Sequence, residues 1–318
     1  MRSATAFAPA TVANVAVGFD ILGFAIESIG DEVTVSITSD QSVRVAPVRD
    51  LADFAAAPDV PLEADKNAAT VGLIKLRQDL HLDFGFEVSL RKGIALGSGL
   101  GGSAASAVGG LVAANSLLET PLPKEALLQY ALLGEEASSA AAHPDNIAPC
   151  LLGGMTLVLS MDPFRYVSLP VPKEILAVVV HPRIRVDTRH ARHILKPDVP
   201  LADHVRQSAR LGGFVAGCFQ GDVEMIRRSF ADVVIEPQRA PLIPGFAEVK
   251  AAALDQGALG ASISGSGPSV FGLVTSDEAA ARVRDAMVGA FKANGLNALD
   301  SWISPVNQQG ARIIDEVS

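Results

Sequence analysis

The sequence predicts an α+β protein built from two domains that meet near residue 165. The chain has 318 residues, which is long for one compact core and short for three. Segments with the two-residue period of strands alternate with segments that have the apolar spacing of helices. A stretch with three prolines, Met161 to Lys173, divides the chain as linkers between domains often do. We therefore expect one domain over residues 1–165 and a second over residues 166–318.

Two strands of the first half precede a glycine-rich loop. Apolar and polar residues alternate over residues 33–37 and again over residues 86–90, which is typical of strands with one buried face. The second segment continues through residues 91–96 into the loop.

Helices and one more strand complete the first half. Residues 50–65 are rich in Ala, Pro and Asp and are expected to be irregular. The side chain of Asn67 can cap a helix that runs to about Leu80. Residues 123–142 begin with Pro and have Leu and Ala at helical spacing, so they predict another helix. Two glycines then introduce a strand with the sequence MTLVLS at residues 155–160.

The second half predicts strands interleaved with helices. A continuous apolar run of strand length, residues 175–180, suits a strand buried on both faces. Three helices follow: one from Leu201, a second after a QGD turn, and a third over 244–256 that Gly257 ends. Two strands, over 258–264 and 269–274, then flank a GSGP turn. Thr275 and Glu278 are expected to cap a final helix that Gly295 ends.

Composition and charge exclude several classes of protein. Hydrophobic residues make up 49% of the chain and the net charge is −9, so the chain can bury a core and repels nucleic acid overall. No apolar run approaches the ~20 residues that cross a bilayer, and the N-terminus lacks the apolar core of a secretory signal. Cys150 and Cys218 lie in apolar surroundings and are expected to be buried free thiols of a reducing compartment. We expect a soluble, cytoplasmic protein that binds neither nucleic acid nor membrane.

The loop from Gly97 to Ser106, GSGLGGSAAS, predicts a phosphate site. Glycine lets a ligand approach the backbone closely, and consecutive N–H groups of such a loop can surround an anion. The small-residue segment that follows, up to Leu118, can form a helix that begins at or near Ser103. Because a helix N-terminus offers unpaired donors and the positive end of its dipole, a nucleotide is the first ligand to expect.

Two other glycine motifs compete with this interpretation. The loop lacks the lysine of the G-x-x-x-x-G-K-[ST] motif, which excludes a P-loop. Gly97, Gly99 and Gly102 match the dinucleotide pattern G-x-G-x-x-G, and Glu119 lies at about the distance of its acidic residue. Glu119, however, ends the same helix, with no second strand to carry it to a ribose. A dinucleotide site and a plain glycine-rich turn beside a tightly packed helix are the alternatives.

Three ordered segments carry a resemblance to a known family. They are APATVANVAVGFDILG (8–23), the GSGLGGSAAS loop and GASISGSGPSVFGL (260–273). In this order they resemble the signature motifs of the GHMP kinases, which are galactose, homoserine, mevalonate and phosphomevalonate kinases. The homoserine kinase branch is similar in further segments: HPDNIAPCLLGGM (143–155), TRHAR (188–192), IEPQRAPLIPGF (235–246) and the GFD that ends at Asp20. The similarity spans nearly the full chain.

This resemblance implies the two-domain GHMP kinase fold, which is α+β. Its N-terminal half is like a domain of ribosomal protein S5, with a left-handed βαβ crossover, and its C-terminal half is ferredoxin-like. The resemblance also implies an active site between the halves, ATP and Mg²⁺ as cofactors, and phosphorylation of the side-chain hydroxyl of L-homoserine, a small-molecule substrate, for threonine synthesis. We further expect a homodimer.

The resemblance assigns a set of residues to the nucleotide and its metal. The residues implied to bind ATP are Asn67, Ala95, Leu96, Gly97, Ser98, Gly99, Leu100, Gly101, Gly102, Ser103, Ala104 and Ala105. In similar enzymes Ser103 and Glu135 are the Mg²⁺ ligands, and phosphate oxygens and waters complete the shell that Mg²⁺ prefers. The loop departs from the family pattern at Ala95, where Pro is common, and at Gly102, where a serine usually precedes Ser103.

The resemblance also implies an acceptor site on the other side of the phosphates. The residues assigned to it are Asn14, Asp20, His143, Thr188, Arg192, Arg239 and Gly265. The carboxylate of Asp20 suits an ammonium group, and the guanidinium groups of Arg192 and Arg239 suit a carboxylate. Other arginines nearby in the sequence, Arg183, Arg185 and Arg189, receive no role.

The identity of a catalytic base is the main mechanistic question. In mevalonate kinase relatives an aspartate at a fixed distance before a GG pair is thought to take the hydroxyl proton, and the corresponding residue here is Asn146, which cannot. We therefore expect transfer without a dedicated protein base, because a loose, metaphosphate-like transition state needs little deprotonation of the nucleophile. Asp145 is the fallback base. Ser103, Glu135, Asp145 and Asn146 are thus the residues expected around the reacting atoms.

Two alternatives stay open at this point. Another GHMP small-molecule kinase, acting on mevalonate or a sugar, would share the fold and the motifs, although only an amino acid needs Asp20 as an ammonium partner. A non-catalytic nucleotide-binding protein on the same fold is the second, although it would not need to retain Ser103 and Glu135.

Overall fold

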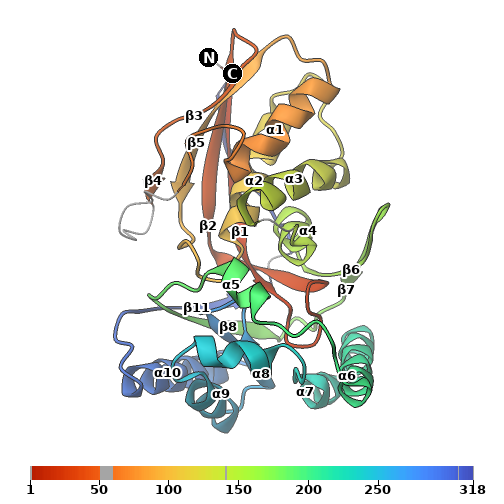
Figure 1. Cartoon of the computed structure of the whole chain (residues 1–318), viewed down its shortest axis with the longest axis vertical. Coiled ribbons are helices and arrows are strands. Elements are labelled where there is room, and N and C mark those ends of the chain that lie inside the picture. The colour runs from red at the N-terminus through yellow and green to blue at the C-terminus, as the bar shows by residue number, and fades with distance from the viewer. Residues whose placement is uncertain (1, 51–59, 140–141, 307, 318) are drawn as a thin grey trace.

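The computed structural model describes residues 2–50, 60–139, 142–306 and 308–317. It contains a larger sheet with helices packed on one face and, below it, a smaller sheet with helices beneath (Figure 1). Both chain ends lie at the far end of the larger sheet. Among the described residues, no helix is long and apolar enough to span a membrane.

The larger sheet is mixed and takes strands from both ends of the chain. Its strands are β1 (Ser3–Ala13), β2 (Leu22–Thr38), β3 (Val43–Val45), β4 (Arg49–Asp50), β5 (Gly85–Lys92), β6 (Met155–Met161), β7 (Phe164–Leu169) and β12 (Arg312–Val317). The main order is β12-β1-β2-β5-β3, and β6 pairs with the start of β2. Neighbouring strands are antiparallel except β3 and β4, which run parallel to β5.

Helices of the first half cover one face of this sheet. They are α1 (Ala68–Asp79), α2 (Gly102–Ser116), α3 (Leu128–Ser139), which follows a 3₁₀ turn over Lys124–Leu127, and α4 (Pro144–Leu152). α2 consists almost entirely of small apolar residues and lies directly on β1 and β2. A Cβ added at Gly109 would come within 2.5 Å of the Val33 side chain, so this close contact requires glycine. The approach places the start of α2 over the end of β5.

The smaller sheet is antiparallel and forms most of the second half. Its order is β11 (Leu299–Pro305), β8 (Leu176–Pro182), β10 (Val270–Val274) and β9 (Gly260–Ile263). The helices of this half are α5 (Thr188–His193), α6 (Leu201–Gln220), α7 (Val223–Ser229), α8 (Glu236–Arg239), which continues into a 3₁₀ turn over Ala240–Leu242, α9 (Phe246–Asp255) and α10 (Asp277–Ala293). Of these, α5 lies between the two sheets (Figure 1).

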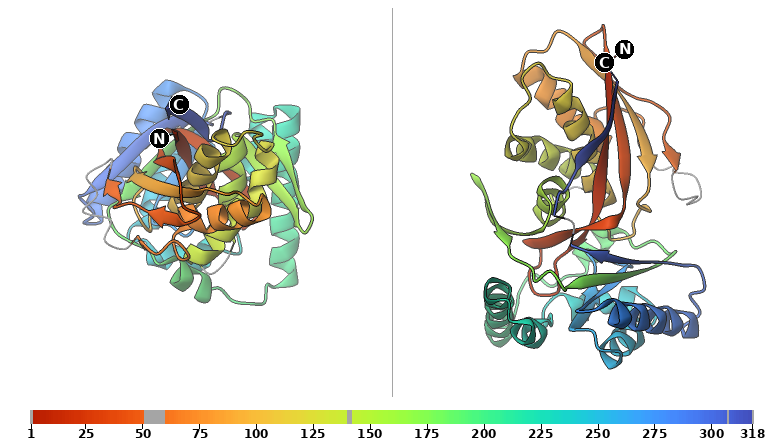
Figure 2. Two further views of the ribbon diagram at one scale, coloured as in Figure 1. Left: turned by 90° about the horizontal axis from the view of Figure 1, so that it is seen from above. Right: turned by 180° about the vertical axis from the view of Figure 1, so that it is seen from behind.

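The two halves share a core, and the second half contributes strands to the larger sheet. β12 returns from the C-terminus to pair with β1 (Figure 2), and most of β7 lies beyond residue 165 while pairing with β6. Phe24 of β2 and Phe271 of β10 meet edge to face, with ring centroids 5.9 Å apart. The division into residues 1–165 and 166–318 stays a prediction, and the sheets themselves do not follow it.

Most of the predicted elements are confirmed, and one cap is wrong. Asn67 caps α1, accepting a hydrogen bond from the Ala69 N–H at 2.9 Å, and the two cysteines are buried free thiols. The final helix is capped by Ser276 rather than Thr275, because Ser276 is the extended residue whose hydroxyl accepts from the Ala279 N–H. Several elements carry no prediction, among them β1, α4, β7, β11 and β12. Residues 51–59 of the predicted irregular segment lie outside the described residues.

Candidate active site

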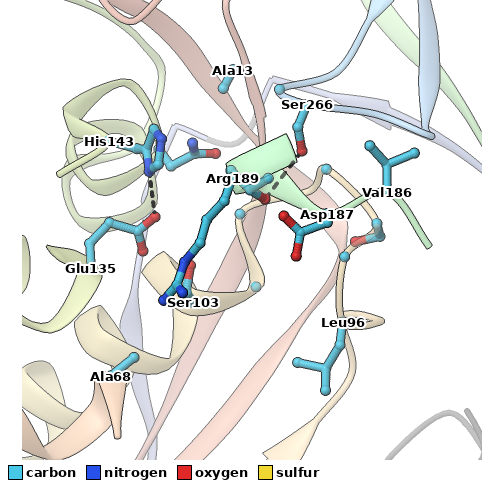
Figure 3. Close-up of a pocket in the computed structure, with 18 of the residues that line it drawn as sticks. Ala13, Ala68, Leu96, Ser103, Glu135, His143, Val186, Asp187, Arg189 and Ser266 are labelled. Atoms are coloured by element: carbon cyan, nitrogen blue, oxygen red, sulfur yellow. Dashed lines mark hydrogen bonds and ion pairs between the residues drawn. The ribbon is translucent and has the colours of Figure 1, made fainter. Parts of the chain in front are cut away.

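A cavity of about 610 Å³ lies between the two halves of the molecule. Its walls come from the loop after β1, the start of α1, the glycine loop with the first turn of α2, the body of α3, the start of α4, α5, α8 and the β9–β10 turn. Helices and turns of both halves therefore meet at one space, at the end of the larger sheet that faces the smaller one (Figure 3).

The glycine loop forms the first turn of α2 at one end of the cavity. Gly101 is the N-cap of α2 and is left-handed, with φ 68°. A Cβ there would lie 2.1 Å from Thr11 Oγ1 and 2.8 Å from Asn146 Oδ1, so both conformation and space demand glycine. Ser103 is then the second helical residue, and its side chain borders the cavity (Figure 3). A helix N-terminus in this position can hold an anion.

Three successive carbonyl groups of the glycine loop accept hydrogen bonds from the second half of the chain. The donors are the Val186 N–H to Gly97 O at 3.3 Å, the Ser269 N–H to Ser98 O at 3.2 Å and the Ser264 hydroxyl to Gly99 O at 2.7 Å. The loop is therefore fixed from outside by its acceptors. Apart from the Ser98 N–H, which donates to Ala95 O at 3.3 Å, its amide groups are its contribution to an anionic ligand.

Most residues assigned to the nucleotide line the cavity, and three do not. Those at the cavity wall are Asn67, Ala95, Leu96, Gly97, Ser98, Gly99, Gly101, Gly102 and Ser103. Leu100, Ala104 and Ala105 instead pack in the hydrophobic core, each at most 1% exposed, because this turn of α2 faces β1 and β2. Their side chains therefore anchor the loop to the core and do not face the cavity.

Glu135 and His143 form a buried pair beside Ser103. His143 Nδ1 lies 3.0 Å from Glu135 Oε1. Burial lowers the pKa of His143, but the hydrogen bond and charge of Glu135 outweigh it and the net shift is upward. Glu135 and Ser103 border the same part of the cavity (Figure 3). One carboxylate and one hydroxyl next to a phosphate site fit Mg²⁺, which takes few protein ligands, and the described residues include no cluster of three His, Cys, Asp or Glu side chains that could hold a metal.

A buried lysine supports the loop from beneath. The Lys92 ammonium contacts the Asp31 carboxylate and donates to Gly102 O at 2.8 Å and to Ser106 Oγ at 2.9 Å. Lys92 is 4% exposed and Asp31 is fully buried. All three ammonium donors thus have partners within the chain, so the cluster ties the first turn of α2 to β2 and β5.

Asp145 and Asn146 follow one another at the start of α4 and have different surroundings. Burial, together with the nearby charge of Asp20, raises the pKa of Asp145 to about 7, against the opposing effect of His143. Among the described residues, Asp145 Oδ1 has no hydrogen-bond partner although it is buried. Asn146 Oδ1 accepts a hydrogen bond from Thr11 Oγ1 at 2.6 Å. Asn146 therefore links the start of α4 to Thr11 near the end of β1. The carboxyl group of Asp145 is free to interact with a ligand.

The loop after β1 is unusual in its backbone. Asn14, Val15 and Ala16 are all left-handed, with φ of 70°, 42° and 59°, and Asp20 follows with φ 62°. L-residues adopt this conformation at a cost and seldom in succession, and such strain is typical of functional sites. Asn14 stabilises the turn, because its side chain donates to Gly265 O at 2.9 Å and accepts from the Asp20 N–H at 3.1 Å.

The charged residues assigned to the acceptor gather around one aromatic ring. Arg192 and Arg239 each place a guanidinium carbon 5.1 Å from the centroid of Phe19, so the predicted convergence of the two arginines is present. Arg192 also forms a bidentate ion pair with Asp20, at 2.6 and 2.8 Å. The groups expected to bind the opposite ends of an amino acid therefore bind each other here. Thr188 lies beside them, with Oγ1 3.4 Å from Ser266 Oγ.

Arg239 is fixed more firmly than Arg192. It is 4% exposed and donates to Ala191 O at 3.2 Å and to Gly265 O at 2.9 Å. Burial, with the nearby charge of Arg192, lowers its pKa to about 10, which still leaves it cationic at neutral pH. Arg192, by contrast, is 39% exposed in its ion pair, and such pairs are worth only about 0–1 kcal/mol.

The sequence interpretation missed several residues at this site. Phe19, which stacks with both arginines, lies inside the recognised first motif but received no role. Arg185 and Arg189 line the cavity, although the sequence interpretation assigned no role to either. The position of Arg189 could have indicated its place in the site, because it directly follows Thr188 in the segment TRHAR.

Two family models match parts of both halves of this chain, and known proteins match it over nearly its whole length. The model for the GHMP kinases N terminal domain matches residues 67–154, and the model for the GHMP kinases C terminal domain matches residues 214–293. The chain is 47% identical over 314 residues to a homoserine kinase of Xanthomonas campestris pv. campestris, covering 99% of this chain and 95% of that protein.

Two further comparisons agree with these. The homoserine kinase of Chloroherpeton thalassium is 44% identical over 322 residues, covering 99% of this chain and all of that protein. The crystal structure of the homoserine kinase from Cytophaga hutchinsonii superposes with a TM-score of 0.93 at 45% identity, covering 98% of this chain and 97% of the other. The two-domain arrangement seen here is thus the same as in that crystal structure.

Proposed function

Because this chain belongs to the GHMP kinase family, we propose that it is a homoserine kinase, which transfers the γ-phosphoryl group of ATP to the side-chain hydroxyl of L-homoserine. The product is O-phospho-L-homoserine, an intermediate of threonine synthesis. The observation that carries the proposal is a single cavity with an anion site at one end and, at the other, acidic and basic side chains matched to an amino acid.

At the first end, the glycine loop and the start of α2 hold the triphosphate. Amide groups of the loop and the helix N-terminus supply donors, and the Ser264 and Ser269 contacts keep the loop in place. Ser103 and Glu135 would hold Mg²⁺. When bound, the ion would neutralise charge on the β- and γ-phosphate oxygens.

At the second end, an amino acid can exchange with the Asp20–Arg192 ion pair. Its ammonium group would bind Asp20 and its carboxylate would bind Arg192 and Arg239, so each charge of the pair gains a new partner. Since the existing pair is partly exposed, replacing it costs little. The carboxyl of Asp145, which lines the same cavity, would orient the hydroxyl of the acceptor.

The transfer step itself needs no dedicated base. The hydroxyl oxygen attacks the γ-phosphorus in line, the bond to the bridging oxygen of ADP breaks, and the hydroxyl proton passes to an oxygen of the transferred phosphoryl group as the new ester bond forms. An ammonium group bound beside Asp20 would lower the pKa of Asp145 toward its ordinary value. Asp145 would then be a carboxylate that orients the acceptor rather than a strong base.

The variant D145N tests this part of the proposal. We expect its kcat to fall by less than about 10²-fold, because general-base catalysis is typically worth about 10²–10⁴-fold and only orientation is lost. Steady-state kinetics with L-homoserine at several pH values measure this. A fall of 10³-fold or more with unchanged KM, or the loss of a pH dependence near 7, would make Asp145 the base.

The reaction is tested directly with the purified wild-type protein. With MgATP and L-homoserine, the enzyme should form ADP, which a coupled assay detects. The ³¹P NMR spectrum should show a phosphate monoester. Mevalonate, galactose and L-serine serve as alternative acceptors. No homoserine-dependent ADP, or a preference for mevalonate or galactose, would reject the assignment. The homodimer and the cytoplasmic location expected from the sequence stay predictions.

A further inference from the structure

Several cationic side chains line the cavity, and three of them are held by hydrogen bonds or ion pairs close to the predicted phosphate and acceptor sites. Lys92 is held by Asp31, Gly102 and Ser106. Arg239 is held by two backbone carbonyls, and Arg192 by the Asp20 carboxylate. Each of these three cations is thus already held in place by partners within the chain.

Arg189 is different. It lines the cavity and is exposed, and within the described part of the chain its guanidinium forms neither an ion pair nor a hydrogen bond. Figure 3 shows its side chain extending from α5 toward Ser103 and Glu135. A cation with all five donors open thus projects toward the first turn of α2.

The placement of α5 separates the roles of its two arginines. Just before α5, the Val186 N–H donates to Gly97 O at 3.3 Å, so this end of the segment lies against the glycine loop. Toward the other end, the Ala191 carbonyl accepts from Arg239 Nε at 3.2 Å, so that end lies against the acceptor site. Arg189 precedes Arg192 by almost one helical turn, about 5 Å along the axis. Arg189 is therefore nearer the phosphates, and Arg192 nearer the acceptor.

A cation beside the transferred group favours phosphoryl transfer. In the transition state, charge is spread over three equatorial oxygens of the moving group, and catalysis consists largely of neutralising that charge. A guanidinium group suits the task because its planar fork can donate two hydrogen bonds to phosphate oxygens. It would also act across the domains, since α5 follows the smaller sheet while the glycine loop follows the larger one.

From this geometry we propose that Arg189 is a catalytic residue that binds the γ-phosphoryl group of ATP and stabilises it during transfer. The catalytic role of Arg189 rests on the proposed kinase function. Its binding role stands alone: Arg189 distinguishes ATP from ADP, because the γ-phosphate is the group that it contacts.

The variants R189Q and R189K test the assignment, with R206Q as the matched control. Arg206 is an exposed arginine on α6 that does not line the cavity. We expect R189Q to lower kcat by about 10²–10³-fold, the usual loss for one preorganised donor, with little change in the KM for L-homoserine. R189K should retain an intermediate kcat, because it keeps the charge and loses the fork. R206Q should behave as wild type, and circular dichroism should show that all three variants are folded.

Nucleotide binding gives a second readout that needs no acceptor. By calorimetry with Mg²⁺, R189Q should weaken the binding of a non-hydrolysable ATP analogue while leaving ADP binding unchanged. Wild-type kcat in R189Q, a rise confined to the KM of L-homoserine, or equal weakening of both nucleotides would overturn the inference. If the wild-type protein failed to phosphorylate L-homoserine but R189Q still lost only the ATP analogue, the proposed acceptor would be wrong and the Arg189 contact would stand.

Discussion

The carboxyl group of Asp145 makes the stability of the protein depend on pH in an unusual direction. Its pKa is raised from 3.8 to about 7, chiefly by burial, so the folded protein binds a proton here that the unfolded chain has already released. The stabilising contribution is fully present below pH 4 and is lost as the pH rises through about 7. Asp145 therefore destabilises the ligand-free fold at alkaline pH, as an unpaired buried carboxylate in a binding site can.

The variant D145N removes this titration and should stabilise the protein only above the pKa of the carboxyl group in the unfolded chain. Above pH 7 we expect a gain of at most about 4 kcal/mol, from about 1.4 kcal/mol per pKa unit, and near pH 4 almost none. Urea unfolding at pH 4, 6 and 8 measures the difference, with D255N at an exposed position as control. An equal gain at all three values would contradict the argument.

At the same scale, the site could be predicted only where its signals are local. The glycine loop and the Asn67 cap depend on backbone conformation and capping, which a few neighbouring residues determine. The resemblance then supplied Asp20, Arg192 and Arg239, but it could not show that Asp20 and Arg192 pair with each other. That pairing, like the direction of Arg189, depends on how the two halves pack.

Among the elements, β2 shows why periodicity predicts only part of a strand. The alternation over residues 33–37 lies where β5 pairs with β2 and one face is covered by α2. β2 begins much earlier, at Leu22, and its first residues are buried without alternation. There α4 and β11 both contact it, so both faces are covered and a two-residue period has no cause.

The start of α2 should respond to glycine replacement in the opposite way from the middle of α10. At Gly101, alanine would be forced into φ 68° and against Thr11 Oγ1. We expect G101A to lower the free energy of unfolding by about 1–3 kcal/mol from strain alone, and to abolish measurable ATP binding because the helix start must shift. Thermal unfolding and calorimetry with the ATP analogue measure the two effects.

Gly289 provides the matched control for this prediction. It lies inside α10, and a Cβ there would have nothing within 4 Å. Since glycine is poorer than alanine in a helix, G289A should raise the free energy of unfolding by about 0.5–1 kcal/mol and leave ATP binding unchanged. If both variants were neutral, the crowding at Gly101 would not be what shapes the loop.

At the scale of the whole molecule, Phe271 packs the two sheets against each other. The fully buried ring on β10 lies 5.9 Å from Phe24 of β2 and 5.7 Å from Phe230, measured between centroids. Residues from both sheets belong to the same hydrophobic cluster, and β12 ties the C-terminus to β1. Hence the protein should unfold in a single transition although it has two sheets.

The variant F271A tests that coupling, because truncation removes both ring contacts and leaves a cavity between the sheets. We expect a loss of about 3–5 kcal/mol, whereas F219A, at a ring 58% exposed, should change stability by no more than about 0.5 kcal/mol. Fluorescence of Trp302, the single tryptophan, reports on β11 of the smaller sheet, and far-ultraviolet circular dichroism reports on the whole chain. The two curves should coincide in the wild-type protein. If Trp302 unfolds before the bulk signal in F271A, the shared core is what makes the two halves cooperative; if the curves already separate in the wild type, each sheet folds on its own core.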